Sequence, residues 1–282
     1  MKGKFTVNNF SEAKGTGEKI TMLTAYDYPT AKIFDQAGVD SILVGDSLGM
    51  VVLGYEDTTK VTMDDMVHHT KAVVRGVKRA MVVADLPFLS YHLGVKKSVK
   101  NAGRLVAEGG CTAVKMEGGK EIVEDVKAII NAGIPVMGHL GYTPQSINIF
   151  GGHKAQGKTY ETAKKILSDA LALQEAGVFS MVLECVPYLL AEYITSKLDV
   201  PTIGIGSGAG CDGQVLVNSD IVRMDKNFSP KHSKVYQDLG DGYESAAKSY
   251  IEEVKTGIFP TAANSFKIDE EILNKVKEEN GD

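Results

Sequence analysis

The sequence predicts an α/β protein built as one eight-stranded β/α barrel, a (β/α)8 or TIM barrel, over residues 1–282 with a helical tail at its carboxyl end. Two observations lead to this prediction. Short apolar runs recur along the chain with amphipathic segments between them, and several of these segments end in a glycine that leads into the next run. In addition, charged residues follow several runs, at the end of the strands where barrel enzymes place their active sites.

Seven apolar runs are clear strand candidates. They are rich in Val, Ile, Leu and Met and lack a clean polar alternation, as expected for parallel strands covered on both faces. They lie at residues 20–24, 41–44, 80–84, 112–116, 135–138, 180–183 and 201–205. The eighth strand is placed loosely within residues 213–222, where 214–217 is the remaining apolar run.

The segments between the runs are interpreted as helices. Thr62 and the acidic residues after it predict a capped helix that continues to Val77. Four glycines are expected to be left-handed C-caps that turn the chain into the next strand: Gly38, Gly110, Gly133 and Gly177. This order favours right-handed βαβ units. After about residue 225 the chain becomes a polar tail, with helices expected at 243–256 and from Asp269.

Composition narrows the possible functions. Hydrophobic residues make up 43% of the chain, yet no apolar stretch approaches the roughly 20 residues of a membrane span. A net charge of −5 without a basic stripe argues against nucleic-acid binding and favours small-molecule substrates. The amino-terminal residues lack the apolar core of a secretory signal, so we expect a cytoplasmic protein. Cys111, Cys185 and Cys211 show no CxxC spacing and are expected to be packed thiols.

Two aspartates follow strand candidates and are the first candidate site residues. Asp46 comes after the run at 41–44, and Asp85 comes after the run at 80–84. Their hard oxygens suit Mg²⁺, which usually takes one or two protein carboxylates together with substrate oxygens and water. The alternative is that each aspartate only caps the helix that follows its strand.

Lys115 and Glu117 are two residues apart on one strand, so their side chains point to the same face. If Val114 and Met116 pack against the helices, the charged pair points into the barrel mouth. A structural ion pair is one alternative, and a Schiff-base lysine is another.

Other candidates lie at the ends of later strands. Glu184 follows the sixth strand beside apolar residues and is suited to proton abstraction, although a cap or an ion pair is the alternative. His139 ends the fifth strand and could bind or orient a ligand, whereas His68 and His69 fit a surface or packing role. The glycine-rich run at 204–210 could cradle a phosphate or allow close packing. The insertion at 148–160 could be a mobile loop over the site.

Several short motifs occur in a fixed order along the chain. They are TAYD at 24–27, VGDSLG at 44–49, ADLPF at 84–88, VKMEG at 114–118, GHLG at 138–141, LECVP at 183–187 and GIG at 204–206. As an ordered set they resemble the ketopantoate hydroxymethyltransferase family. The resemblance implies a barrel of the phosphoenolpyruvate/pyruvate-domain type, a Mg²⁺ requirement and a homo-oligomer, typically a decamer. Residues 230–236 depart from the family pattern.

The resemblance also implies a reaction in pantothenate synthesis. A hydroxymethyl group would pass from 5,10-methylenetetrahydrofolate to 3-methyl-2-oxobutanoate through a Mg²⁺-stabilised enolate, giving 2-dehydropantoate. In this interpretation Asp46 and Asp85 match metal ligands that also contact the substrate, and Glu117 lies close to the metal. Glu184 matches the proton acceptor.

Three further residues complete the expected substrate site. Ser47 and Lys115 match residues that hold the keto acid, and His139 belongs to the motif at the end of the fifth strand. A second hypothesis keeps the barrel and Mg²⁺ but makes the protein a C–C lyase or phosphonomutase that needs no folate. A third is a non-catalytic scaffold, which the charged strand ends argue against because such groups are costly to bury.

Overall fold

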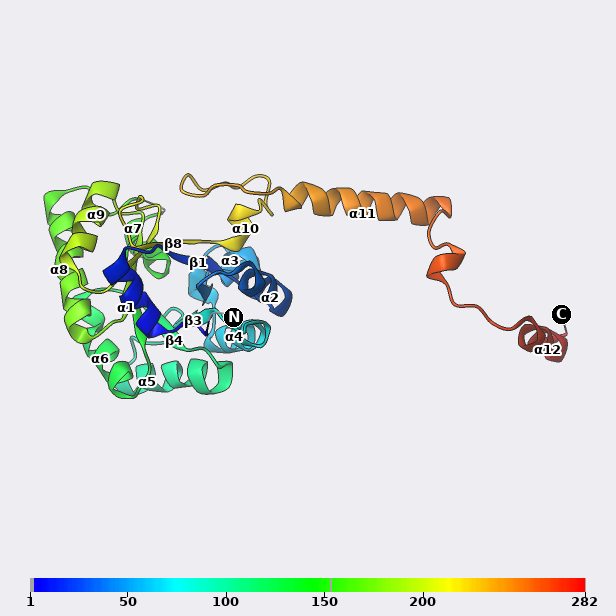
Figure 1. Ribbon diagram of the computed structural model, residues 1–282, viewed down its shortest axis with the longest axis horizontal. Helices are drawn as coiled ribbons and strands as arrows, with labels where there is room; N and C mark the ends of the chain where they lie inside the picture. Colours follow the sequence, from blue (N-terminus) through cyan, green and yellow to red (C-terminus); the bar gives the residue numbers. More distant parts are fainter. Residues whose placement is uncertain (1–2, 153, 282) are drawn as a thin grey trace.

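The computed structural model describes residues 3–152 and 154–281 and contains a closed barrel of eight parallel strands that follow one another in sequence order (Figure 1). The strands are β1 Ile20–Thr24, β2 Ser41–Val44, β3 Met81–Asp85, β4 Ala113–Glu117, β5 Val136–Gly141, β6 Ser180–Glu184, β7 Thr202–Ile205 and β8 Gly213–Leu216. The predicted barrel is therefore confirmed. Several strands begin or end one to three residues away from the predicted bounds.

Helices surround the barrel, and α1 closes its amino end. The longer ones are α1 Val7–Thr16, α2 Tyr28–Ala37, α4 Met63–Gly76, α5 Val95–Arg104 with the π-helical turn η2 Leu105–Gly109, α6 Val123–Asn131, α8 Tyr160–Ala176 and α9 Tyr188–Lys197. Short helices lie in the connections: α3 Leu48–Val51, η1 Thr58–Lys60, η3 Lys120–Ile122, η4 Pro144–Ser146, α7 Ile147–Phe150 and α10 Asn218–Ile221.

Local signals in the sequence explain where helices begin and end. Thr62 accepts a hydrogen bond from the Asp65 backbone N–H, and the Asp65 carboxylate accepts one from the Thr62 N–H, which forms the predicted capping box of α4. Gly38, Gly110 and Gly177 are left-handed caps as predicted. Gly133 also has a positive φ of 88°, one residue after the C-cap of α6.

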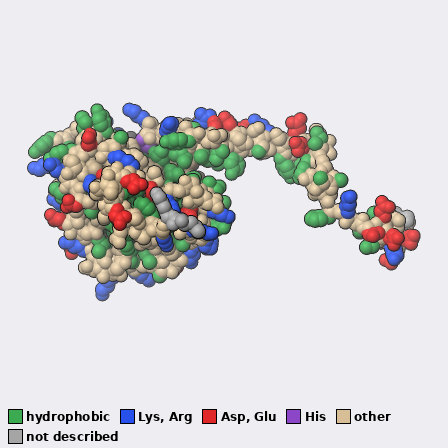
Figure 2. All heavy atoms as spheres, in the orientation of Figure 1, with side chains coloured by type: hydrophobic (Ala, Val, Ile, Leu, Met, Phe, Trp, Pro, Cys, Tyr) green, Lys and Arg blue, Asp and Glu red, His purple; other side chains and the backbone are tan. Residues whose placement is uncertain are grey.

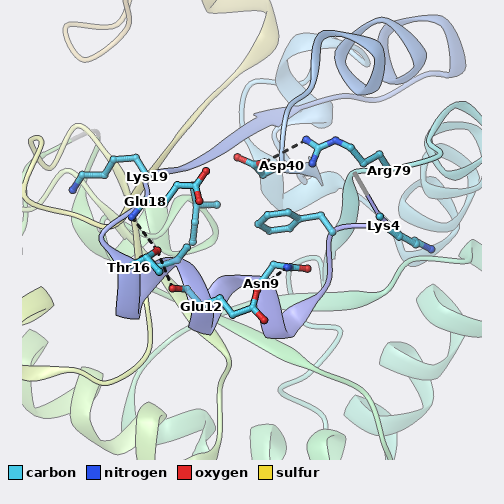
Figure 3. Close-up of a pocket in the computed structure, with 12 residues that line it drawn as sticks. Lys4, Asn9, Glu12, Thr16, Glu18, Lys19, Asp40 and Arg79 are labelled. Atoms are coloured by element: carbon cyan, nitrogen blue, oxygen red, sulfur yellow. Dashed lines mark hydrogen bonds and ion pairs between the residues drawn. The ribbon is translucent and has the colours of Figure 1, made fainter. Parts of the chain in front are cut away.

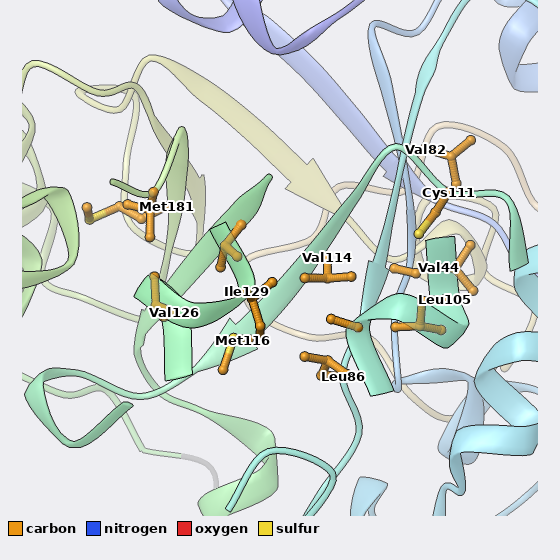
Figure 4. Packing of buried hydrophobic residues seen from close by; sticks show 14 of the residues in the cluster. Val44, Val82, Leu86, Leu105, Cys111, Val114, Met116, Val126, Ile129 and Met181 are labelled. Carbon is orange, nitrogen blue, oxygen red and sulfur yellow. The ribbon is translucent and has the colours of Figure 1, made fainter. Parts of the chain in front are cut away.

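Apolar side chains form two layers, one on each side of the strands. The outer layer packs the strands against the helices and includes Val114 and Met116 (Figure 4). The inner layer fills the barrel with side chains such as Met22, Val83, Met137 and Val182. Phe10 of α1 closes the layer from below, with its ring centroid 5.1 Å from that of Phe179.

The inner face of the barrel changes from apolar to charged toward the carboxyl ends of the strands. On β4, Ala113 belongs to the inner layer, and Lys115 and Glu117 follow on the same face two and four residues later. On β3, Val83 is followed in the same way by Asp85. The charged pair therefore faces the barrel mouth, as the sequence predicted.

The carboxyl-terminal tail leaves the barrel (Figure 1). It contains α11 Leu239–Thr256, η5 Ala262–Asn264 and α12 Glu270–Asn280. Helix α11 begins four residues before the predicted start because Asp238 caps it, accepting from the Asp241 N–H at 3.0 Å. Figure 2 shows hydrophobic side chains along one side of this helix. The exposed ones of α11 and α12 are Leu239, Tyr243, Tyr250, Ile251, Val254, Ile272, Leu273 and Val276.

Candidate active site

The predicted site residues gather at the carboxyl rim of β2 to β6. Asp46 lies just beyond β2, and Asp85, Glu117 and Glu184 are the last residues of β3, β4 and β6. The strand register pairs Asp85 with Lys115, and Glu117 with His139. Asp46, Asp85, Lys115, Glu117 and His139 are all buried, with no more than 5% of their surface exposed. Five charged or titratable groups are thus enclosed in one small volume.

The three buried carboxylates accept hydrogen bonds from two residues of the connections that follow β2 and β5. The Asp46 backbone N–H donates to Asp85 Oδ2 at 3.1 Å, which ties the β2 loop to β3. Asp46 Oδ2 accepts from the side-chain amide of Gln145 at 2.8 Å. Glu117 Oε2 accepts from the Gln145 backbone N–H at 3.0 Å. Each carboxylate therefore has one oxygen engaged by a neutral N–H group.

The electrostatics favour binding of a cation. Burial raises the pKa of Asp46 well above its usual value, and the neighbouring carboxylates of Asp85 and Glu117 raise it further. Burial also raises the pKa of Asp85, and it raises that of Glu117 to about 7. For Lys115, burial lowers the pKa, but the surrounding carboxylates outweigh it and the net pKa is raised, so the ammonium form is favoured. The Lys115 ammonium is thus surrounded by three acids, Asp46, Asp85 and Glu117, in a medium of low dielectric.

Lys115 and His139 connect the acids of β3 and β4 to Glu184. Lys115 Nζ lies 3.1 Å from Asp85 Oδ1 and 3.0 Å from His139 Nδ1. Because an ammonium can only donate, Nδ1 must accept, and the ring proton belongs on Nε2. His139 Nε2 lies 3.3 Å from Glu184 Oε2, although this contact is not aligned as a full hydrogen bond. Burial, followed by the charge of Lys115, lowers the pKa of His139, so the ring is neutral.

Ser47 lies next to the carboxylates and contacts a tyrosine. Its hydroxyl is 2.8 Å from the hydroxyl of Tyr26, a buried residue just beyond the carboxyl end of β1. Burial raises the pKa of Tyr26, which therefore remains a neutral phenol. The pair places two hydroxyl groups beside the acids.

The donor set at the rim fits a hard divalent cation. Glu117 Oε1 is a buried oxygen without a hydrogen bond in the described part of the chain, and Asp85 Oδ1 pairs with the Lys115 ammonium at 3.1 Å. Among residues 3–152 and 154–281, no group of three or more His, Cys, Asp or Glu side chains is already arranged around a metal position. Mg²⁺ usually takes one or two protein carboxylates and completes its shell with substrate oxygens and water. Asp46 and Asp85 could supply these carboxylates, with Glu117 beside them.

Two residues that build the site were not predicted from the sequence. Gln145 lies in η4 after β5, and Tyr91 lies in the connection between β3 and α5. Both are buried, and their side chains are hydrogen-bonded to one another at 2.8 Å. The only signal for Gln145 is its place shortly after the carboxyl end of a strand, in the sequence Tyr-Thr-Pro-Gln.

Other predicted features lie outside the site. The glycines at 204–210 allow α9 to pack closely, since a Cβ at Gly208 would lie 2.5 Å from Tyr188 Cβ and one at Gly210 would lie 2.6 Å from Glu192 Cβ. Burial raises the pKa of Cys111 to about 12 and that of Cys185 to about 11, so neither thiol is activated as a nucleophile.

His68, His69 and a cavity are separate from the site, whereas the insertion at 148–160 reaches the rim beside Glu184, where the Gln156 N–H donates to the Cys185 carbonyl oxygen at 3.0 Å. His69 Nδ1 contacts the Tyr26 carbonyl oxygen at 2.6 Å, a packing role, and His68 is exposed. The insertion at 148–160 includes residue 153, which lies outside the described residues. A cavity of about 400 Å³ next to Lys4, Lys19 and Arg79 opens at the amino end of the barrel, opposite the site (Figure 3).

Comparison with known proteins places the chain in one family. The model of the ketopantoate hydroxymethyltransferase family matches residues 4–262. A protein of Acetivibrio thermocellus named 3-methyl-2-oxobutanoate hydroxymethyltransferase is 72% identical over 276 residues, which cover 98% of each chain. A protein of Clostridium novyi with the same name is 58% identical, over 97% of this chain and 99% of the relative.

Solved structures share the fold at low sequence identity. A phosphonopyruvate hydrolase in complex with oxalate and Mg²⁺ superposes with a TM-score of 0.61 at 13% identity, covering 97% of this chain and 96% of the other. A 2,3-dimethylmalate lyase of the PEP mutase/isocitrate lyase superfamily gives 0.59 at 14% identity, over 98% and 95% of the two chains. These similarities confirm the predicted type of barrel and concern the fold alone.

Proposed function

The chain belongs to the ketopantoate hydroxymethyltransferase family, and we propose that it transfers a hydroxymethyl group from 5,10-methylenetetrahydrofolate to 3-methyl-2-oxobutanoate, giving 2-dehydropantoate and tetrahydrofolate. In this proposal the folate supplies the methylene carbon and water supplies the hydroxyl group. The observation that carries the proposal is the connected set Asp85, Lys115, His139 and Glu184 beside the acids Asp46 and Glu117 at one rim. This set can hold an α-keto acid and remove a proton from it.

Asp46 and Asp85 would hold Mg²⁺, with Glu117 close to it. When bound, Mg²⁺ would polarise the keto group of the substrate and stabilise negative charge that develops on its oxygen. Glu117 Oε1, a buried oxygen with no hydrogen bond within the described residues, supports this assignment, whereas Asp85 Oδ1 already pairs with the Lys115 ammonium at 3.1 Å. Burial of several carboxylates is costly without a compensating cation, which also supports it.

Lys115 would offset the negative charge of the bound keto acid, and Ser47 would donate a hydrogen bond to it. The position of Lys115 Nζ is fixed by Asp85 and His139, at 3.1 Å and 3.0 Å. A preorganised ammonium of this kind needs no rearrangement when charge develops during the reaction.

Glu184 would accept the proton from C3 of the keto acid. Its side chain is 16% exposed, whereas Glu117 is 3% exposed, so it is the acid of the site that is most open to an incoming substrate. The neutral His139 would orient Glu184 through its Nε2–H group. The enolate carbon left by proton removal would then attack the methylene carbon of the folate.

The dependence of turnover on methylenetetrahydrofolate tests this function. We expect purified protein with Mg²⁺ and 3-methyl-2-oxobutanoate to form 2-dehydropantoate only when the folate is added. Cleavage of an oxaloacetate-like acid or rearrangement of a phosphonate without folate would instead support a lyase or phosphonomutase.

The protein would act as a homo-oligomer, with a decamer expected, in the cytoplasm. The exposed apolar side chains of α11 and α12 support self-association, because contiguous apolar surface of this kind usually marks an interface. The three cysteines are unpaired, as expected in a reducing compartment. No helix of the described residues is long and apolar enough to cross a membrane.

A further inference from the structure

Gln145 links two carboxylates of the barrel rim, Asp46 beyond β2 and Glu117 at the end of β4. Its side-chain Nε2 donates to Asp46 Oδ2 at 2.8 Å and to the Leu86 carbonyl oxygen at 2.9 Å. Its backbone N–H donates to Glu117 Oε2 at 3.0 Å, and its Oε1 accepts from the Tyr91 hydroxyl at 2.8 Å. One buried residue therefore contacts the β2 loop, the residue after β3, the end of β4 and the connection before α5.

The hydrogen-bond partners fix the orientation of the Gln145 amide. The Leu86 carbonyl can only accept a hydrogen bond, and an ionised Asp46 carboxylate can also only accept. If the amide were flipped, Oε1 would face two acceptors and Nε2 would face the Tyr91 hydroxyl. The observed orientation satisfies both N–H groups and the oxygen, whereas a flipped amide would lose the hydrogen bonds to Asp46 and to the Leu86 carbonyl.

We propose that Gln145 is the positioning residue of the metal site, an inference that rests on the proposed function. It engages Asp46 Oδ2 and Glu117 Oε2 with neutral donors and leaves the second oxygen of each carboxylate for the cation. An amide suits this task for an electrostatic reason. A Lys or Arg would neutralise the acids and compete with the metal, whereas a Glu would add a fourth negative charge. The amide orients the acids without changing the net charge of the site.

Calorimetric titration of chelator-treated full-length protein with MgCl₂ tests the proposal. Gln145→Met keeps the length of the side chain and the backbone N–H to Glu117 but removes the donor to Asp46. We expect its Mg²⁺ affinity to fall about 10- to 100-fold, the usual effect of removing a group that orients a metal ligand. Tyr91→Phe removes the hydroxyl that holds Oε1 and that also contacts the backbone O and N–H of Glu117, at 3.0 Å and 3.2 Å, and its affinity is expected to fall in the same direction by a smaller factor.

Gln174→Met is the matched control. Gln174 Oε1 accepts from the backbone N–H groups of Asp199 and Val200, at 2.7 Å and 3.2 Å, near the amino end of β7. The variant makes the same chemical change at the opposite end of the barrel, so its Mg²⁺ affinity should equal that of the parent.

The outcomes separate the inference from the function on which it rests. If Gln145→Met has a lower melting temperature but binds Mg²⁺ as the parent does, the residue is only structural and the inference is wrong, while the proposed function stands. If Gln145→Met does not fold, Tyr91→Phe decides, and an unchanged affinity overturns the inference. A parent protein that binds no Mg²⁺ overturns both the inference and the metal site.

Discussion

Replacement of Glu184 by Gln tests the proposed base directly. The amide has the shape of the carboxylate but cannot accept a proton from carbon, and its Oε1 can take the place of the carboxylate oxygen that lies 3.3 Å from His139 Nε2. Asp46, Asp85 and Lys115, which would bind the keto acid, are not altered. A positioned general base typically raises the reaction rate about 10²- to 10⁴-fold, which corresponds to a reduction of the activation free energy by about 3 to 5 kcal/mol.

The assay follows exchange of the C3 hydrogen of 3-methyl-2-oxobutanoate into deuterated water by NMR, with Mg²⁺ and without folate. We expect Glu184→Gln to lose at least about 100-fold in exchange rate while its affinity for the keto acid, measured by calorimetry, stays close to that of the parent. Glu192→Gln, the same change on the exposed surface of α9, should exchange at the parental rate. Exchange at the parental rate in Glu184→Gln would refute the assignment of the base.

Three other predictions concern the acids and the tail. Asp85→Ala should weaken Mg²⁺ binding in calorimetry and destabilise the chain by about 3 to 5 kcal/mol in urea unfolding, because Lys115 loses its buried partner. Burial raises the pKa of Glu117 to about 7 in the folded protein. The stability that Glu117 contributes to the metal-free protein is therefore fully present at a pH below the ordinary pKa of a glutamate, and it is lost as the pH rises through about 7. The melting temperature of Glu117→Gln should therefore rise relative to the parent between pH 5 and pH 8, and a constant difference would contradict this. Removal of residues 239–282 should give a smaller assembly in light scattering, and an unchanged assembly size would exclude the tail from the interface.

The sequence was sufficient to predict the barrel because the strands are buried on both faces and give continuous apolar runs. The eighth strand was hardest to place for a physical reason. It contains Gly213, where a Cβ would lie 2.5 Å from the Ile20 carbonyl oxygen, and it also contains the exposed Gln214. Close packing against β1 requires the glycine, and this requirement weakens the apolar pattern that marks the other strands.

The site residues on the strands and directly after them were also predictable, whereas those deeper in the connections were not. Lys115 and Glu117 are placed by the two-residue period of a strand, so their common face follows from spacing alone. Gln145 and Tyr91 lie in connections that follow β5 and β3, where no period relates sequence position to direction. Their roles depend on how two loops meet over the rim, and only the three-dimensional structure gives this information.

The charges of the site support the proposed cation and explain the value of a layer of apolar residues beneath it. Three buried carboxylates and one ammonium leave an excess of two negative charges when all are ionised, the charge that one divalent cation would balance. Without such a cation the site can reduce its charge only by binding protons, in line with the raised pKa values of Asp46, Asp85 and Glu117. The stability to tolerate this arrangement must come from elsewhere in the fold. The inner apolar layer, which includes Phe10 and Val182, supplies this stability, because burial of apolar surface offsets the cost of enclosing charge at one end of the same barrel.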